Sequence, residues 1–596
     1  MNCLSRIMLS VCLVMTTACT VVAPLQPVAV VLPKAPEVAS GRTEKIAVAS
    51  KKFMIAAADP RATQAGYQML KAGGSAIDAA IATQMVLSLV EPQSSGIGGG
   101  GFMMFFDGQQ TKAFDGRETA PATATDSLFQ GADGKPMSFY AGVVGGRSVG
   151  VPGELRMLEA AYRQYGRLPW KSLFTPAIKL ADEGFVVSPR LAKLLATDQY
   201  LQNDVTARNY FFDRDGKPWP AGHLLKNPQF AQVLRDVAEG GADAFYHGRV
   251  ARDIVAKVQG HPTNPGRLSL DDIAGYQAKV RAPICTDVKT FTVCGMPPPS
   301  SGGIAVAQLL GILSHTAIAT AEPQDGSPSP EAIHLFSEAG RLVFADRARY
   351  VADTDFVPLP GKSFKALVDP GYLASRAQLI TSQSMGVASF GSPPAATVAA
   401  GLDTSPELPS TSHMSIVDAQ GRAISMTSSV EDQFGSRQMV DGFLLNNQLT
   451  DFSFNSRDAE GLIANRVQGG KRPRSAMAPT FVFEKSTQKL ILAIGSPDGS
   501  AIINHVGKVL IAMMDWGLDV QQAISLPNFG SRNGPTELEE GRVTDATVAA
   551  LKAKGHKIVV IPQTSGLQGI MRLQIHGEEI WLGGADPRRE GLVMGD

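Results

Sequence analysis

The sequence has little cysteine, no excess of charge of either sign and no apolar run long enough to cross a bilayer. Lysine and arginine together number 55, and aspartate and glutamate also number 55, so the charge balance does not favour a nucleic-acid partner. The apolar run at residues 7–15 is far shorter than the roughly 20 residues that a membrane span needs. A hydrophobic content of 44% is typical of an ordinary globular protein.

The scarcity of cysteine excludes a cysteine-rich metal site. Beyond Cys19 only Cys285 and Cys294 remain, and they are too few for such a site. Residues 284–294 are predicted to form two short strands, and a two-residue turn between them would place Cys285 opposite Cys294. Opposed cysteines could form a disulfide in an oxidising compartment. Lys-Thr is not a favoured hairpin turn, so free thiols remain the alternative.

The first 42 residues predict export. A basic residue, the apolar run and the small residues before Cys19 make residues 1–19 a secretory signal. Ala18-Cys19 is similar to a lipoprotein cleavage site, although Thr16 stands where leucine is usual. Three interpretations stay open: a lipid anchor on Cys19 as the sole membrane attachment, release into the periplasm, or no export. Residues 20–42 contain several prolines and are interpreted as a tether.

Residues 57–403 contain alanine- and glycine-rich periodic blocks without an evident linker, which indicates one large α/β unit. A helix is predicted to begin at Pro60 and to end at the glycines 73–74. Ser75 and Asp78 form a predicted capping box at the start of a second helix.

The glycines at 96–101 match the pattern G-x-G-x-x-G. A dinucleotide-binding turn requires a strand before the glycines and a helix after them. Here the predicted helix precedes the glycines and a strand at 102–106 follows them. Nucleotide binding is therefore not expected, and the glycines are interpreted as positions of close backbone packing.

A loop-to-strand junction lies at Thr411. Residues 404–410 are rich in proline, serine and threonine and predict a loop. The following residues alternate in polarity through Met414 and Ile416 and predict a strand. On these residues alone, Thr411 is an ordinary turn residue.

The segment Thr-Ser-His-Met-Ser that starts at Thr411 resembles the active-site segment of the gamma-glutamyltransferases, in the N-terminal-nucleophile hydrolase superfamily. Similar blocks occur in the same order from about residue 57 to the last few residues. The resemblance implies an α+β fold, a four-layer αββα sandwich of antiparallel sheets covered by helices. It also implies acyl transfer from glutathione or another gamma-glutamyl amide, with no metal or cofactor.

The resemblance further implies self-cleavage between Ser410 and Thr411. Residues 43–410 would become a large subunit and residues 411–596 a small catalytic one, both in one structural unit. A threonine hydroxyl needs an adjacent base to act as a nucleophile. The freed α-amine of Thr411, with an ordinary pKa of about 8, would supply that base.

The resemblance assigns five residues to the substrate. Arg117 and Ser475 would hold the α-carboxylate of the glutamyl group, because a guanidinium fork and a hydroxyl both donate to carboxylates. Glu431, Gln448 and Asp451 would surround its amino group. On sequence alone, Arg117 could equally be a surface residue paired with neighbouring acids, and Asp451 a turn or cap residue.

Three further positions are assigned to catalysis, and some depart from the family pattern. Ser429 would steady the nucleophile, and the backbone amides of Asp498 and Gly499 would form the oxyanion hole. The family has glycine at the position of Asp498, whose carboxylate could turn toward the oxyanion or away from it. Ala476 replaces a serine, which removes one hydroxyl from the carboxylate site.

Two other functions compete with this hypothesis. The departures at Ser429, Ala476 and Asp498 make a related acylase credible, such as one that acts on glutaryl-cephalosporin side chains. An uncut and inactive envelope binding protein is the alternative from another class. The family-like block at 582–588 is expected to be structural.

Overall fold

The computed structural model describes residues 40–396, 400–406, 408, 410–575 and 577–596. The predicted signal at 1–19, Cys19 and most of the tether at 20–42 lie outside these residues. Among the described residues, no helix combines the length and the apolar character that crossing a membrane requires.

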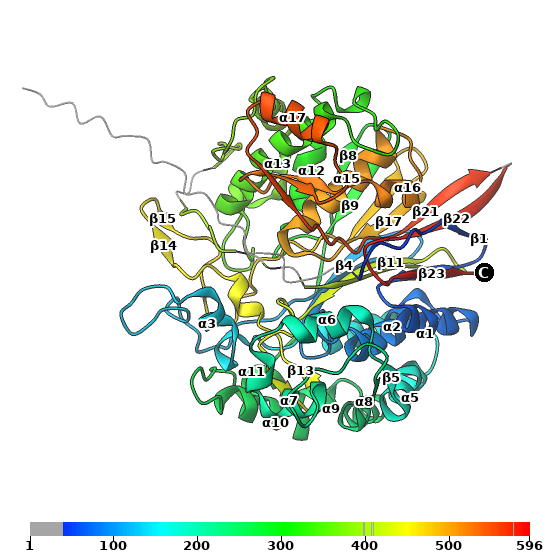
Figure 1. Cartoon of the computed structure of the whole chain (residues 1–596), viewed down its shortest axis with the longest axis vertical. Helices are drawn as coiled ribbons and strands as arrows, with labels where there is room; N and C mark the ends of the chain where they lie inside the picture. The colour runs from blue at the N-terminus through cyan, green and yellow to red at the C-terminus, as the bar shows by residue number, and fades with distance from the viewer. Residues whose placement is uncertain (1–39, 397–399, 407, 409, 576) are drawn as a thin grey trace, which may run out of the picture. The chain divides into compact units, whose positions relative to one another are not determined.

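Two seven-stranded antiparallel sheets lie at the centre of the fold (Figure 1). The first has the order β1 (Val48–Ser50), β22 (Glu578–Ala585), β21 (Gln568–Ile575), β17 (Leu490–Gly495), β16 (Thr480–Glu484), β9 (Phe291–Gly295) and β8 (Ile284–Val288). The second has the order β23 (Leu592–Gly595), β2 (Met54–Ala57), β10 (Ser412–Val417), β11 (Ala423–Ser429), β3 (Gly100–Phe106), β4 (Thr111–Gly116) and β7 (Lys279–Arg281).

Helices cover the outer face of each sheet, which completes the expected αββα sandwich (Figure 1). On the side of the second sheet lie α1 (Pro60–Lys71), α2 (Ala76–Val90), α4 (Glu154–Tyr165), α5 (Thr175–Glu183), α6 (Pro189–Thr197), α7 (Val205–Phe211), α8 (Pro228–Gly240), α9 (Asp243–Tyr246), α10 (Arg249–Gln259) and α11 (Leu270–Ala274). On the side of the first sheet lie α12 (Gly302–Leu313), α13 (Pro330–Tyr350), α14 (Pro370–Ala377), α15 (Ile502–Met514), α16 (Val520–Ser525) and α17 (Asp545–Ala553).

Short elements complete the described chain. They are α3 (Phe139–Val143) and the strands β5 (Phe185–Val186), β6 (Leu224–Leu225), β12 (Met439–Val440), β13 (Phe443–Leu444), β14 (Arg457–Asp458), β15 (Gly461–Leu462), β18 (Phe529–Gly530), β19 (Thr536–Glu539) and β20 (Ile558–Ile561).

Successive side chains along each strand point to opposite faces of the sheet, so they pack into different layers. In β3, Phe102 and Met104 point between the two sheets, whereas Met103 and Phe105 pack with α2. In β10, Met414 and Ile416 also belong to the helix-side core. Each such buried side chain stabilises the fold by roughly 1.5–3 kcal/mol through its removal from water.

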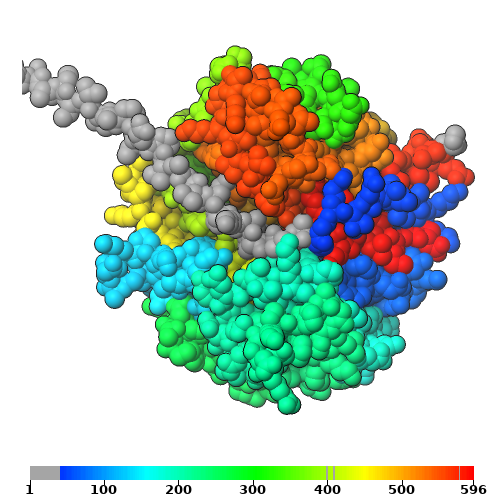
Figure 2. Space-filling view, in the orientation of Figure 1, coloured from blue at the N-terminus to red at the C-terminus, as the bar shows by residue number. Residues whose placement is uncertain are grey.

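The segments before and after residue 410 share one sheet. Strand β10 pairs on one side with β2, with Met414 opposite Ala57, and on the other side with β11. Strand β11 pairs in turn with β3. In the space-filling view the blue N-terminal strands lie beside the red C-terminal ones, as the pairing of β1 with β22 requires (Figure 2). A cut after Ser410 would therefore leave the sheet pairing in place.

Gly96, Gly98 and Gly99 lie between α2 and β3, and Gly100 and Gly101 begin β3, so the helix precedes the glycines and the strand follows, as expected from the sequence. A β-carbon on Gly98 would lie 2.1 Å from the carbonyl oxygen of Leu444, and one on Gly99 would lie 2.2 Å from that of Ser429. Gly98 therefore allows the backbone to pack against β13, and Gly99 allows it to pack against the end of β11, where Ser429 lies.

Strands β8 and β9 form the predicted hairpin, with Lys289 in the left-handed region at φ 54°. Cys285 is directly opposite Cys294, and the two are joined by a disulfide with their Cα atoms 4.1 Å apart. The expected register holds even though Lys-Thr is not a favoured turn pair.

Candidate active site

Thr411 immediately precedes β10 and lines a pocket whose walls, apart from Leu408, come from the chain after residue 410. The pocket contains about 290 Å³ of space not filled by protein atoms, counting the part open to solvent. Its lining residues are Leu408, Thr411, Ser429, Glu431, Gln448, Asp451, Ser475, Ala476, Met477, Gly499 and Ile502. The fold thus brings seven of the predicted site residues, distant in sequence, to one surface.

The bond between Ser410 and Thr411 is buried and held by hydrogen bonds from several elements. The Ser410 side chain donates to the carbonyl oxygen of Gln93 at 2.6 Å. The Ser410 carbonyl oxygen accepts a hydrogen bond from Ser429 Oγ at 2.7 Å. Thr411 Oγ1 lies 3.5 Å from the same Ser429 Oγ. Ser429 therefore contacts both the threonine hydroxyl and the carbonyl that precedes it.

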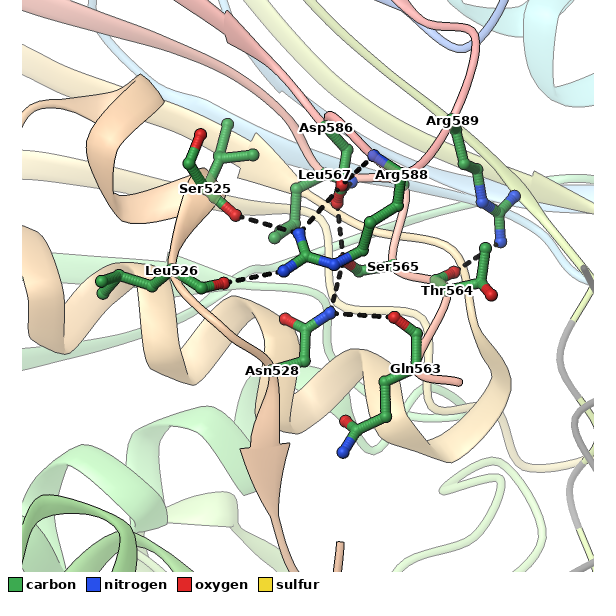
Figure 3. A network of polar contacts seen from close by, with 12 residues as sticks. Ser525, Leu526, Asn528, Gln563, Thr564, Ser565, Leu567, Asp586, Arg588 and Arg589 are labelled. Atoms are coloured by element: carbon green, nitrogen blue, oxygen red, sulfur yellow. Dashed lines mark hydrogen bonds and ion pairs between the residues drawn. The ribbon is translucent and has the colours of Figure 1, made fainter. Parts of the chain in front are cut away.

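A C-terminal arginine holds the other side of Thr411. Arg589 Nη1 donates to the Thr411 carbonyl oxygen at 3.3 Å. Its Nη2 donates to the carbonyl oxygen of Thr564 at 3.0 Å (Figure 3). The neighbouring Arg588 is bonded to Asp586 and to the carbonyl oxygen of Leu526 (Figure 3). The C-terminal segment thus links Thr411 to the loop before β21 and to the residue that follows α16.

Glu431 lies two residues after Ser429, in a strained turn. Its φ of 82° lies in the left-handed region, and its backbone N–H donates to Ser429 Oγ at 2.8 Å. Asn447 Nδ2 donates to Glu431 Oε2. Burial, followed by the nearby charges of Asp451 and Asp432, raises the pKa of Glu431 well above its ordinary value. A cation that enters the pocket would favour the ionised form of the Glu431 carboxyl group.

Two acceptor atoms in the pocket wall have no hydrogen-bond partner among the described residues. They are Glu431 Oε1 and Gln448 Oε1, and both are buried. Gln448 Nε2 donates to Asp451 Oδ2 at 3.4 Å, which orients the amide with its oxygen free. Buried polar groups normally have partners, so this wall is complementary to a ligand that donates hydrogen bonds.

Arg117 lies behind the pocket rather than on its surface. The side chain is fully buried and pairs with Asp451, and its Nε and Nη2 donate to the carbonyl oxygens of Pro473 and Arg474 at 3.1 and 2.9 Å. Its Nη1 lies 3.9 Å from Glu118, whose pKa is raised to about 8 by burial. In this structure Arg117 therefore acts on the pocket through Asp451.

Ser475 and Ala476 both line the pocket. Ser475 Oγ accepts from the backbone N–H of Met477 at 3.1 Å, and its carbonyl oxygen accepts from Ser301 N and Oγ, both at 2.7 Å. The hydroxyl hydrogen of Ser475 remains available to a ligand, whereas Ala476 presents only a methyl group.

The loop after β17 brings Gly499 to the pocket and directs the Asp498 side chain elsewhere. Asp498 has φ 110° and ψ 50°, and its Oδ2 lies 2.9 Å from Nε2 of His505 in α15. Of the two orientations open to this carboxylate, the structure has the one in which it pairs with His505. Asp498 is not among the residues that line the pocket.

His413 connects β10 to this loop. A β-carbon on Gly495, the last residue of β17, would lie 2.2 Å from His413 Cε1. His413 Nδ1 is 2.9 Å from Thr427 Oγ1, and burial lowers the pKa of His413 to about 3. The imidazole is therefore neutral and fills the space between the two sheets.

Sequence reasoning missed three residues that support the site: Asn447, His505 and Arg589. Asn447 directly precedes Gln448, which the family resemblance assigns to the substrate, so its position was a signal that could have been used. Arg589 follows the block 582–588 directly, but nothing local connects it with a threonine 178 positions earlier. His505 lies three residues after the start of α15, and no sequence signal marked it.

Comparisons with known proteins extend over nearly the whole chain. Residues 62–596 match the model of the gamma-glutamyltranspeptidase family. The glutathione hydrolase proenzyme of Bacillus subtilis strain 168 is 35% identical over 557 residues, which cover 91% of this chain and 92% of that protein. The acylase ACY 1 proenzyme of Pseudomonas sp. strain SE83 is 31% identical over 578 residues, which cover 94% and 96%. The solved cephalosporin acylase from Bacillus halodurans matches with a TM-score of 0.79 at 26% identity, covering 93% of this chain and 98% of that one.

Proposed function

The chain belongs to the gamma-glutamyltranspeptidase family, and we propose that it is a gamma-glutamyl hydrolase and transferase that uses Thr411 as its nucleophile after cutting itself between Ser410 and Thr411. The observation that carries this proposal is the surroundings of that bond. Its carbonyl oxygen accepts from Ser429, and the threonine hydroxyl lies beside the same serine.

In the proposed self-cleavage, Thr411 Oγ attacks the carbonyl carbon of Ser410 and its proton passes toward Ser429. The Ser429 hydroxyl stabilises the oxygen on which negative charge develops. Collapse breaks the C–N bond, the nitrogen takes up a proton, and an ester links Ser410 to Thr411 Oγ. Water hydrolyses the ester, which leaves a carboxylate on Ser410 and a free amine on Thr411.

In the proposed acyl transfer, Thr411 Oγ attacks the gamma-carbonyl of the substrate while its own amine accepts the hydroxyl proton. The backbone N–H groups of Asp498 and Gly499 receive the oxyanion. The protonated amine then gives its proton to the leaving amine, and a glutamyl ester remains on Thr411. Water or an amino acid releases the glutamyl group by the same steps in reverse.

The substrate head group is inferred from the unpartnered acceptors. An α-ammonium group offers three N–H donors, and Glu431 Oε1 and Gln448 Oε1 are available to accept from it beside the Asp451 carboxylate. The Ser475 hydroxyl can donate to the α-carboxylate. Arg117 adds positive charge behind Asp451, and a direct contact with the carboxylate would require its guanidinium to leave that partner.

Two measurements test the proposal. A denaturing gel of the purified protein should show two fragments, and N-terminal sequencing of the smaller one should begin at Thr411. The cleaved protein should release p-nitroaniline from gamma-glutamyl-p-nitroanilide. A single full-length band without turnover would instead support the uncut binding protein.

A second candidate is an acylase for glutaryl amides, and Ala476 in the pocket wall is the observation that favours it. A glutaryl group lacks the ammonium, so it would leave the acceptors of Glu431 and Gln448 unused. We expect kcat/KM for gamma-glutamyl-p-nitroanilide to exceed that for the glutaryl anilide. The opposite ranking would assign the enzyme to the acylases.

The disulfide between Cys285 and Cys294 supports an oxidising location, such as the periplasm. Cell fractionation followed by thiol labelling under denaturing conditions tests this. Two unreactive cysteines in an envelope fraction are expected, and reactive thiols in a cytoplasmic fraction would contradict it.

A further inference from the structure

The loop that would hold the oxyanion contains a residue whose backbone conformation does not suit it. Asp498 has φ 110°, in the left-handed region that L residues with a β-carbon rarely adopt. Gly499 follows with φ 50°, so two consecutive residues are left-handed. The ψ of Asp498 sets the direction of the next peptide, which carries the Gly499 N–H. An unsupported side chain at this position would tend to rotate that N–H away from the pocket.

His505 supplies the support. Its Nε2 lies 2.9 Å from Asp498 Oδ2, and the exposed fraction of each residue is small, 1% for His505 and 7% for Asp498. A buried hydrogen bond to a carboxylate is stronger than one between neutral groups. His505 lies in α15, the helix whose first residue, Ile502, also lines the pocket. The loop is therefore tied to the helix that forms part of the same wall.

The adjacent residues are fixed independently. Ser500 Oγ accepts from Arg532 Nη1 at 3.0 Å, and Arg532 is also paired with Glu537. Gly495, at the start of the loop, packs against His413. Both ends of the loop are thus held by neighbours. At the left-handed step itself, the Asp498 side chain contacts His505, and the Asp498 carbonyl oxygen accepts a hydrogen bond from the backbone N–H of Ala501 at 3.1 Å.

We propose that the Asp498–His505 pair is a positioning device that orients the oxyanion-binding amides in this chain, in place of the conformational freedom that glycine would give. The pair acts through the Gly499 N–H and does not touch the substrate. The inference rests on the proposed function, because it assumes that these amides receive the oxyanion of an acyl-transfer reaction.

A first test compares Asp498→Ala with Asp498→Gly. Alanine keeps the β-carbon and loses the acceptor, whereas glycine adopts the same φ without support. We expect kcat for gamma-glutamyl-p-nitroanilide to be about tenfold lower in D498A than in D498G, with little difference in KM between the two variants. Equal kcat values for D498A and D498G would overturn the proposal.

A second test uses His505→Gln and His505→Met, each in the wild-type and in the D498G background. Glutamine Nε2 can replace the histidine Nε2 donor, whereas methionine fills similar space without a donor. In the wild-type background H505M should lose about tenfold in kcat and H505Q should lose little. In the D498G background the two variants should be equal. A loss in H505M that persists undiminished in the D498G background would mean that His505 merely stabilises the fold, and would overturn the proposal.

The outcomes separate this inference from the function on which it rests. Cleavage at Thr411 and turnover by the wild-type enzyme are read first, on the gel and in the anilide assay. If neither occurs, the proposed function and this inference fail together. If both occur and the D498A and D498G values coincide, only the Asp498–His505 inference fails. Because the alanine–glycine comparison leaves His505 in place, it decides the matter even if H505M does not fold.

Discussion

Replacing Ser429 with alanine should slow the cut between Ser410 and Thr411 by about 10²- to 10³-fold. Ser429 Oγ is the donor to the Ser410 carbonyl oxygen at 2.7 Å, in a site where both residues are almost fully buried. Removing one donor from an oxyanion site costs about 2.7–4 kcal/mol in the transition state, which corresponds to that range of rates. The Thr411 hydroxyl would also lose Ser429 Oγ as a hydrogen-bond acceptor.

The alanine variant has a second effect on folding. The backbone N–H of Glu431 donates to Ser429 Oγ at 2.8 Å and would lose its acceptor. A buried donor left without a partner costs about 1–3 kcal/mol in the free energy of unfolding. This loss lowers the melting temperature but does not act on the cleavage rate of molecules that have folded.

The assay is a pulse-labelled time course of precursor conversion on a denaturing gel, together with a melting curve of the product. Ser428→Ala is the matched control, because the neighbouring hydroxyl donates to Glu154 at 3.1 Å and does not contact the cut bond. Ser429→Thr keeps the hydroxyl and should restore cleavage. Conversion of S429A at the wild-type rate, or equal slowing in S428A, would refute the assignment of Ser429 to the scissile carbonyl.

Four further substitutions probe the site and its surroundings. Thr411→Ala should fold with a melting temperature near that of the wild-type precursor, stay uncut on the gel and lack turnover; any cleavage would contradict the nucleophile assignment. Glu431→Gln should shift the ratio of kcat/KM for gamma-glutamyl over glutaryl anilides by about tenfold toward glutaryl, because a charged partner of the ammonium is lost; an unchanged ratio would remove Glu431 from the amine site. His413 has a pKa of about 3 in the fold and about 6.5 when unfolded, so the unfolded chain binds the proton first and stability falls as the pH drops from about 6.5 toward 3. Between pH 7 and 5, protonation of His413 in the unfolded chain lowers the free energy of unfolding by about 2 kcal/mol. His413→Gln should remove this loss, so the free energy from chemical denaturation should depend less on pH by that amount. Cys285→Ser should lower the free energy of unfolding by about 2–3 kcal/mol, as expected for a short closed loop, and reductant should then have no additional effect on the melting temperature.

Much of the fold was predictable because its signals are local. The helix α1 and the capping box of α2 were expected from residues within one turn of each helix start, and both are present. The alternation after Thr411 predicted β10 for the same reason. Strand order was not accessible in this way, because β10 lies between β2 and β11 through contacts that periodicity does not encode. The αββα architecture came instead from the family resemblance.

For the candidate site, too, the sequence and the tertiary structure determined different things. The sequence by itself determined which residue types were available: a hydroxyl at Thr411, polar groups at Glu431 and Gln448, and a departure from glycine at Asp498. Only the tertiary structure decided where they point. Arg117 pairs with Asp451 behind the pocket, Asp498 pairs with His505, and Arg589 reaches the carbonyl oxygen of Thr411. These directions depend on partners contributed by other elements, since a buried polar group is oriented by the hydrogen bonds that the fold offers it.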